Sequence, residues 1–224
     1  MSYYQEEEIR RIVTKAVMEN FCADRKAERN SSGSVPVEIS ARHVHLSKTD
    51  LEILFGKGYE LGVRKELSQP GEFASNERVK LITPGGQIEN VSVLGPCRNA
   101  TQVELSATDA RQLKLTVPVA LSGNLSEASD ILILGPAGCV AAKKSTIIAK
   151  AHIHMTSEDA ERFCVQNGDH VRVRLMTERP VTLEDVVIRV KEMGKAKLAM
   201  HIDFDEANAA GCTSKTVGCL LGKS

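Results

Sequence analysis

Four of the six histidines lie in two short repeats, each with one residue between its two histidines. The repeats are residues 43–45 (His-Val-His) and residues 152–154 (His-Ile-His). In an extended strand, side chains at positions i and i+2 point to the same face, so each repeat presents two imidazoles side by side. Neutral imidazole is a common metal ligand. The spacing therefore predicts a metal site divided between two halves of the chain.

A helix start is predicted directly after each histidine pair. Ser47 precedes Asp50 by three residues, and Thr156 precedes Asp159 by the same distance. A hydroxyl residue followed at this distance by an acid caps a helix N-terminus, because both side chains accept hydrogen bonds from free backbone donors. Each pair is therefore expected at the end of a strand, just before a capped helix.

Two further segments resemble this junction. Residues 102–109 place Glu104 where the second histidine of each pair lies, and residues 201–208 place His201 where the first histidine lies. Six ligands exceed the three or four that one zinc ion uses, so we expect two metals with open coordination positions, as in catalytic sites. The predicted ligands are His43, His45, Glu104, His152, His154 and His201.

Arg98 lies in a Gly-Pro-Cys-Arg turn, six residues before Glu104. A guanidinium binds phosphate through a planar set of donors, so Arg98 is a candidate oxyanion-binding residue beside the metals. The alternative is a solvated loop arginine, which is the commoner role. Arg42 should point to the opposite face from His43 and is expected to be structural. His170 lies outside the pattern and is expected at the surface.

Composition excludes several classes of protein. The 29 basic and 29 acidic residues balance, so no electrostatic footprint for nucleic acid or an anionic membrane is present. The six cysteines form no C-x-x-C pair and suit neither a zinc finger nor a secreted disulfide scaffold. No apolar run is long enough for a membrane span, and charges interrupt the N-terminus where a signal peptide would need an apolar core. We expect a reducing, cytoplasmic environment.

Short strands dominate after an N-terminal helix. Residues 5–21 have an apolar stripe at helical spacing, and a polar Ser/Gly-rich linker follows to residue 34. This helix either packs on its own core or binds a groove of another protein, and we favour the second. Residues 79–83 and 87–93 predict a hairpin. Short strands, short helices and an internal repeat predict a mostly β protein of two related small β-barrels with helical caps and a metal site between them.

Four segments together resemble the PduL-type phosphate acyltransferases (phosphotransacylases): residues 40–47, 95–98, 151–156 and 201–208. The resemblance covers about residues 35–222. It implies an enzyme that moves a short acyl group, most often propanoyl, between coenzyme A and phosphate with two zinc ions. It also implies a place in the lumen of a bacterial microcompartment in the cytoplasm, for instance one for propanediol degradation.

The same resemblance implies domain bounds and partners. One barrel would comprise residues 35–45 plus 150–224, and the other residues 46–149. Residues 1–34 would form an encapsulation peptide and linker that contacts shell or lumen proteins. Acyl-CoA and phosphate would be the substrates, nucleic acid and membranes would not be partners, and a homo-oligomer, a dimer, is expected.

Residue roles also follow from the resemblance. One metal, near the coenzyme A thiol, would be held by His43, His45 and Glu104. The other metal would be held by His152, His154 and His201. Arg98 would hold phosphate. The implied coenzyme A contacts are Ser40, Lys65 and Asn208.

Three other functions compete with this interpretation. A dinuclear zinc hydrolase of thioesters or amides would share the histidine pairs, but the amidohydrolases that begin with such a pair need a TIM barrel, which the strand pattern excludes. A cupin-like metal binder would need flanking glycines that are absent. A non-enzymatic scaffold would explain the N-terminal helix but not six converging ligands. Thioester release that depends on phosphate separates the transferase from a hydrolase. The acyl chain length and the native metal stay open.

Overall fold

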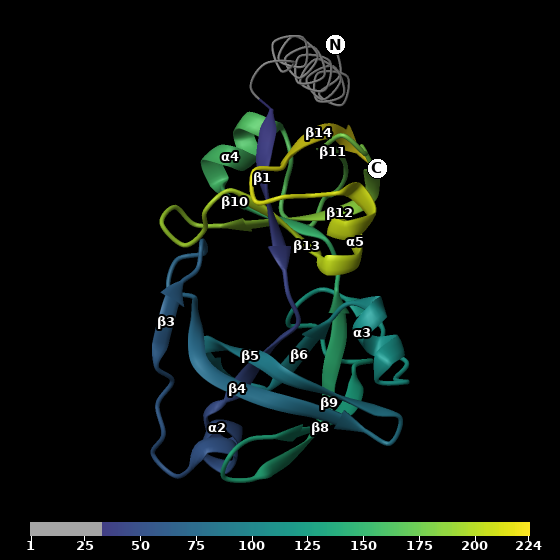
Figure 1. Ribbon diagram of the computed structural model, residues 1–224. Helices are drawn as coiled ribbons and strands as arrows, with labels where there is room; N and C mark the ends of the chain where they lie inside the picture. Colours follow the sequence, from purple (N-terminus) through teal and green to yellow (C-terminus); the bar gives the residue numbers. More distant parts are fainter. Residues whose placement is uncertain (1–32) are drawn as a thin grey trace, which may run out of the picture.

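The computed structural model describes residues 33–224, which form two β-barrels stacked end to end (Figure 1). The predicted N-terminal helix lies outside these residues. The prediction of a mostly β protein with short helices and two small barrels is confirmed. Across residues 33–224, the helices are all too short to cross a membrane.

The barrel at the top of Figure 1, here called the C-terminal barrel, is a closed ring of six strands in the order β1-β13-β10-β12-β11-β14. Helices α4 (Ser157–Phe163) and α5 (Phe204–Ala210) each follow a strand of this ring. The strands are β1 (Ser34–Ser40), β10 (His152–Thr156), β11 (His170–Met176), β12 (Thr182–Lys191), β13 (Ala199–Asp203) and β14 (Val217–Lys223).

The other barrel, here called the central barrel, also has six strands. It closes because β8 pairs with both β4 and β9, which completes the ring β4-β5-β2-β6-β9-β8. Helices α2 (Lys48–Phe55) and α3 (Ala107–Gln112) accompany it, and β3 (Val63–Glu66) and β7 (Val119–Ala120) extend the sheet. The ring strands are β2 (His43–Ser47), β4 (Phe73–Thr83), β5 (Gly86–Arg98), β6 (Gln102–Leu105), β8 (Ser129–Leu134) and β9 (Cys139–Ala149). The β4–β5 pair is the predicted hairpin.

Alternate side chains along the strands point either into a barrel core or away from it, toward solvent or the candidate site. Strand β11 buries every second residue, because successive side chains of a strand point to opposite faces. Val44 and Ile153, the central residues of the two histidine pairs, are fully buried in the cores of the central and the C-terminal barrel, respectively. Because neighbouring side chains in a strand point to opposite faces, the flanking histidines are held on the face away from each core.

The chain passes between the barrels twice. Residues 41–42 join β1 to β2, and residues 150–151 join β9 to β10. The predicted boundary after residue 45 is therefore a few residues late. Strand β2 pairs with β5 and β6, and Val44 lies in the core of the central barrel, so the pairing and the core both assign residues 43–45 to that barrel.

All four strand-to-helix junctions are capped, three of them by a hydroxyl residue as the repeat predicts. Ser47, Ser106 and Thr156 each accept a hydrogen bond from the backbone N–H three residues on. In the fourth junction the cap is Asp203, which accepts from Glu206 N. His201 therefore lies two residues before its cap, at the position of Glu104 and of the second histidine of each pair. Its predicted equivalence to the first histidine was wrong, because an aspartate takes the capping role of the hydroxyl residue.

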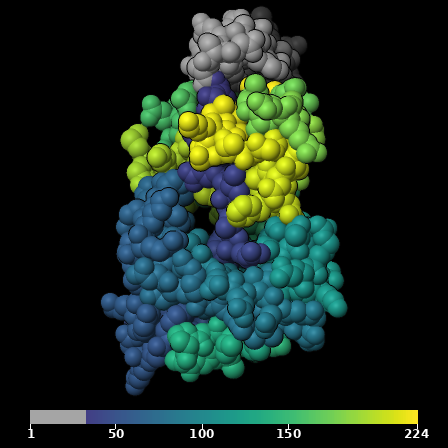
Figure 2. Space-filling model, in the orientation of Figure 1, coloured from purple at the N-terminus to yellow at the C-terminus, as the bar shows by residue number. Residues whose placement is uncertain are grey.

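Hydrogen bonds join the two barrels at opposite sides of the space between them. On one side, Gln69 Nε2 donates to Lys197 O at 3.0 Å, and Lys197 N donates to Gln69 Oε1 at 3.3 Å. On the other, Thr108 N at the start of α3 donates to Asp205 Oδ2 of α5 at 2.7 Å. Figure 2 shows the surface hollowed between the barrels, beside the segment that joins β1 to β2. These contacts bridge the two barrels on either side of the hollow in which the site lies.

Candidate metal centre and anion site

The first group of candidate ligands lies on β2 and β6 of the central barrel. These strands are antiparallel, and His43 is directly opposite Glu104. His43 Nε2 is 3.5 Å from Glu104 Oε2. With His45, these residues offer ligand atoms that all lie within 4.8 Å of one another, and all three are buried. The predicted cluster is thus brought together by one strand pair.

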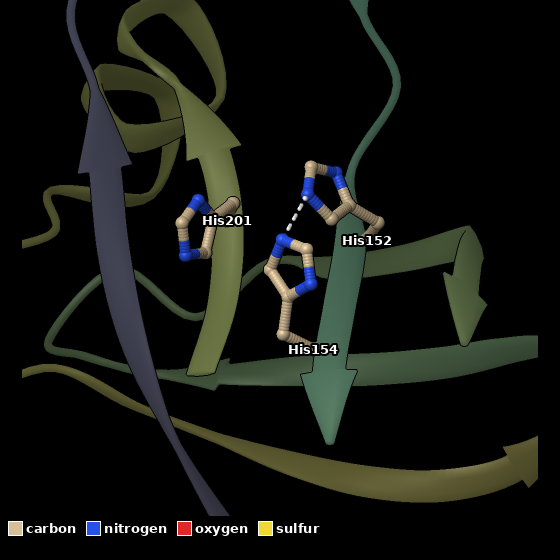
Figure 3. A group of neighbouring side chains, drawn as sticks. All are labelled: His152, His154 and His201. Atoms are coloured by element: carbon tan, nitrogen blue, oxygen red, sulfur yellow. Dashed lines mark hydrogen bonds between the residues drawn. The ribbon is translucent and has the colours of Figure 1, made fainter. Parts of the chain in front are cut away.

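The second group lies on β10 and β13 of the C-terminal barrel. His152 is directly opposite His201 in this antiparallel pair. The three imidazoles face one another from the two strands (Figure 3), and the Nε2 atoms of His152 and His154 are 3.1 Å apart. Their ligand atoms also lie within 4.8 Å of one another. Each barrel therefore supplies one group in the same strand arrangement.

Hydrogen bonds orient the first histidine of each pair. His43 Nδ1 lies 2.8 Å from Ala41 O, and His152 Nδ1 lies 2.8 Å from Lys150 O. A carbonyl oxygen only accepts, so each Nδ1 carries the proton and each Nε2 directs its lone pair into its group. Metal-bound histidines are held in this manner.

Several ring nitrogens in the groups lack a partner. His45 Nδ1, His154 Nδ1 and His201 Nε2 are buried without a hydrogen bond to any described residue. His201 Nε2 lies 3.3 Å from Glu38 Oε2, but outside hydrogen-bond geometry. Buried polar atoms without partners cost free energy, and a bound cation would satisfy them. The donor sets, three imidazoles in one group and two imidazoles with a carboxylate in the other, fit zinc.

Burial keeps these side chains in the protonation states that bind metal. It lowers the pKa of His45 and of His154 to about 2, and that of His152 to about 4. These imidazoles are therefore neutral at pH 7. Burial alone would raise the pKa of Glu104, but the adjacent His43 and His45 outweigh it and lower that pKa to about 2. The carboxylate is therefore ionised.

A cavity of about 560 Å³ separates the barrels and is lined by both groups. Arg98, at the end of β5, lines it too. The Arg98 Nη1 donates to Ser122 Oγ at 3.2 Å, and its Nη2 lies 3.8 Å from Glu72 Oε1. The predicted oxyanion residue is thus in the same space as the six candidate ligands, and a partly exposed guanidinium there can meet a bound anion.

Gln102 was not predicted, although it links the first group to Arg98. Its Nε2 donates to Glu104 Oε1 at 2.5 Å and to Ser122 Oγ at 2.8 Å, while its Oε1 accepts from Gly123 N at 2.8 Å. Ser122 in turn accepts from Arg98. The signal in the sequence is its position two residues before Glu104, which places both side chains on one face of β6.

The three residues assigned to coenzyme A by resemblance have different surroundings. Ser40 lines the cavity. Lys65, on β3, and Asn208, on α5, are exposed and do not line it. The structure places Arg64, the neighbour of Lys65, at the cavity instead.

Two further predictions concern residues other than the proposed ligands. Arg42 forms an ion pair with Asp109 of α3, as expected of a structural residue, but it also lines the cavity. His170 is exposed and pairs with Asp185 on the surface of the C-terminal barrel.

Comparison with known proteins shows one consistent likeness. The phosphate propanoyltransferase family matches residues 36–213. A phosphate propanoyltransferase of Alkaliphilus metalliredigens is 46% identical over 217 residues, which cover 97% of this chain and 99% of that protein. That of Priestia megaterium is 51% identical over 84% of this chain and 86% of its own length. That of Thermotoga maritima is also 51% identical, over 78% of this chain and 82% of its own length. The match spans both barrels and both groups of candidate ligands.

Proposed function

The chain belongs to the phosphate propanoyltransferase family and is an acyltransferase, and we propose that it moves a short acyl group between coenzyme A and inorganic phosphate at a two-zinc site. Propanoyl is the acyl group that the relatives' names support. The observation that carries the proposal is the convergence of two metal-ligand groups and Arg98 on one cavity.

His43, His45 and Glu104 would hold one zinc ion, and the three histidines of the C-terminal barrel would hold the other. Zinc bound at these positions would polarise the thioester carbonyl and stabilise the thiolate that leaves.

Arg98 would bind the phosphate and orient one of its oxygens toward the thioester carbonyl carbon. A carbon–oxygen bond then forms as the carbon–sulfur bond breaks, giving acyl phosphate and the coenzyme A thiolate. Through Ser122 and Gln102, the guanidinium is joined to the Glu104 carboxylate, so a phosphate bound by Arg98 would be positioned relative to the first group. None of the described cysteines lines the cavity, and direct transfer needs no acyl-cysteine.

The test measures free thiol release from acetyl-, propanoyl- and butanoyl-CoA, with and without phosphate, on protein of known metal content. We expect phosphate-dependent release, fastest with propanoyl-CoA, and about two metals per chain. Release that does not depend on phosphate would instead support the zinc hydrolase. Metal-loaded protein that releases no thiol would contradict both.

We also propose that residues 1–34 direct the enzyme into a microcompartment lumen and that it works there as a homodimer. The apolar stripe at residues 5–21 supports a groove-binding role. Residues 1–34 fused to a fluorescent protein should become enclosed when expressed with microcompartment shell proteins, whereas a fusion with Ile9, Ile12 and Val13 changed to serine should stay diffuse. Analytical ultracentrifugation tests the dimer.

A further inference from the structure

Strand β12 brings two basic residues to the cavity beside the second histidine group. Arg189 is directly opposite His154 in the parallel β10–β12 pair, and Lys191 is opposite Thr156. Both basic side chains line the cavity. Neither belongs to the predicted ligands or to the implied coenzyme A contacts.

Arg189 has no counterion of its own. Within residues 33–224 its guanidinium makes no hydrogen bond or ion pair, although it is partly buried. Arg98, in contrast, bonds to Ser122 and lies near Glu72. Burial lowers the pKa of Arg189, the carboxylates of Glu104 and Glu72 oppose this, and the positive charge of Arg98 adds to it. A partly desolvated guanidinium without a partner is unfavourable, so this position favours an anionic ligand.

The internal repeat adds a second cation, Lys191, to the same wall of the cavity. In the β2–β5 pair, Arg98 is opposite Ser47, which caps α2. In the equivalent β10–β12 pair, Lys191 is opposite Thr156, which caps α4. Each barrel therefore places a cation at the same point of its junction, facing one shared cavity. The counterpart of Arg98 in the C-terminal barrel is thus Lys191, whereas Arg189 occupies the position of Leu94 in the central barrel.

We propose that Arg189, flanked by Lys191, is a second phosphate-binding residue of the cavity, on the wall that the C-terminal barrel provides. The inference rests on the proposed function, because that function brings phosphate groups into the cavity. The phosphate oxygens come either from inorganic phosphate, shared with Arg98, or from the phosphate groups of coenzyme A. A guanidinium can bind either through paired N–H donors.

The test compares Arg189→Gln and Arg189→Lys with Arg174→Gln, which removes an exposed arginine on β11 that does not line the cavity. The KM values for phosphate, propanoyl-CoA and propanoyl-pantetheine, which has no phosphate groups, are measured on protein of equal metal content. Calorimetric titration with phosphate and with coenzyme A gives the Kd values without turnover. We expect Arg189→Gln to weaken one of these ligands at least tenfold, Arg189→Lys to weaken it less, and Arg174→Gln to match the wild type.

The pattern of loss identifies the source of the phosphate. If Arg189→Gln raises the KM for phosphate, and does so with propanoyl-pantetheine as well, Arg189 binds inorganic phosphate. If Arg189→Gln raises the KM for propanoyl-CoA but leaves the KM for propanoyl-pantetheine unchanged, Arg189 binds the phosphate groups of coenzyme A. If Arg189→Gln keeps every KM and Kd within twofold of an active wild type, the inference is wrong and the proposed function stands. If the wild type shows no phosphate-dependent release, the proposed function fails, and the Kd values alone decide on Arg189.

Discussion

His43 and Glu104 occupy directly opposed positions in the β2–β6 pair, with 3.5 Å between Nε2 and Oε2. His152 and His201 occupy the same relation in the β10–β13 pair. The first group thus includes a carboxylate where the second has an imidazole. A divalent ion would leave the first group with one net positive charge and the second with two. The two proposed metals would therefore differ in how strongly they attract an anion.

Each group should bind its metal separately, because each is built on its own barrel. We expect the wild type to contain about two zinc ions per chain, and His43→Ala and His154→Ala about one each, as measured by inductively coupled plasma mass spectrometry. The control is His170→Ala, which removes an exposed histidine and should retain both ions. Complete metal loss in either single variant would contradict the independence of the groups.

Arg98→Ala should lower kcat/KM for phosphate by roughly 10²–10³-fold, the effect of removing one donor to a developing oxyanion. Arg98→Lys should lose less, because it keeps the charge but not the paired donors. Steady-state assays at varied phosphate give both values. Arg111→Ala, which removes an exposed arginine of α3, serves as the control. Unaltered kinetics for phosphate in Arg98→Ala would remove the role assigned to this residue.

Gln102→Leu should loosen the first group without removing a proposed ligand. The substitution takes away the donors to Glu104 and Ser122, and it leaves the buried Glu104 oxygen unpaired. We expect a loss of about 1–3 kcal/mol in the free energy of unfolding of metal-free protein. Zinc affinity at the first group should fall about 10–100-fold, as for other residues that orient a ligand.

Urea unfolding and competition with a zinc chelator measure these two effects. Gln166→Leu, at an exposed position, controls for the change in side-chain polarity. Wild-type zinc affinity in Gln102→Leu would mean that the Gln102–Glu104 hydrogen bond does not position the carboxylate.

Glu206, in the capping box of α5, should make stability depend on pH. Burial raises its pKa to about 7, with Asp203 and Asp205 contributing. Because the folded pKa lies above the unfolded value near 4.5, the stabilisation is present below pH 4.5 and is lost as pH rises through 7. Glu206→Gln keeps an acceptor for the Asp203 N–H and removes the titration.

We therefore expect Glu206→Gln to exceed the wild type in stability by about 1–3 kcal/mol at pH 8, and by much less at pH 5, with the partial exposure of the side chain reducing the effect. Urea unfolding at both pH values tests this. Glu161→Gln, on the exposed face of α4, should show no such pH-dependent difference. An equal gain at both pH values would mean that the charge of Glu206 is not responsible.

The sequence predicts most of the site because the two histidine pairs obey strand periodicity and precede recognisable caps. It misplaces His201 within its junction, because Asp203 caps α5 where a hydroxyl was expected. It misses Gln102 and Arg189, because an amide or an arginine in a strand is usually a surface residue. Only the folded chain shows that Gln102 bonds to Glu104 and that Arg189 lines the cavity. The barrel boundary likewise depends on hydrogen bonds between distant strands, which local patterns do not encode.

Strand β1 has a consequence for how the protein is made. It pairs with β13 and β14 at the other end of the chain, so among the strands of residues 33–224 it leaves the ribosome first and finds its partners last. At typical rates of bacterial and eukaryotic synthesis, β1 waits roughly 10–40 s before residues 199–223 appear. The central barrel can close during this interval, because its ring strands all lie within residues 43–149. The order of translation thus predicts that the second metal group is assembled after the first.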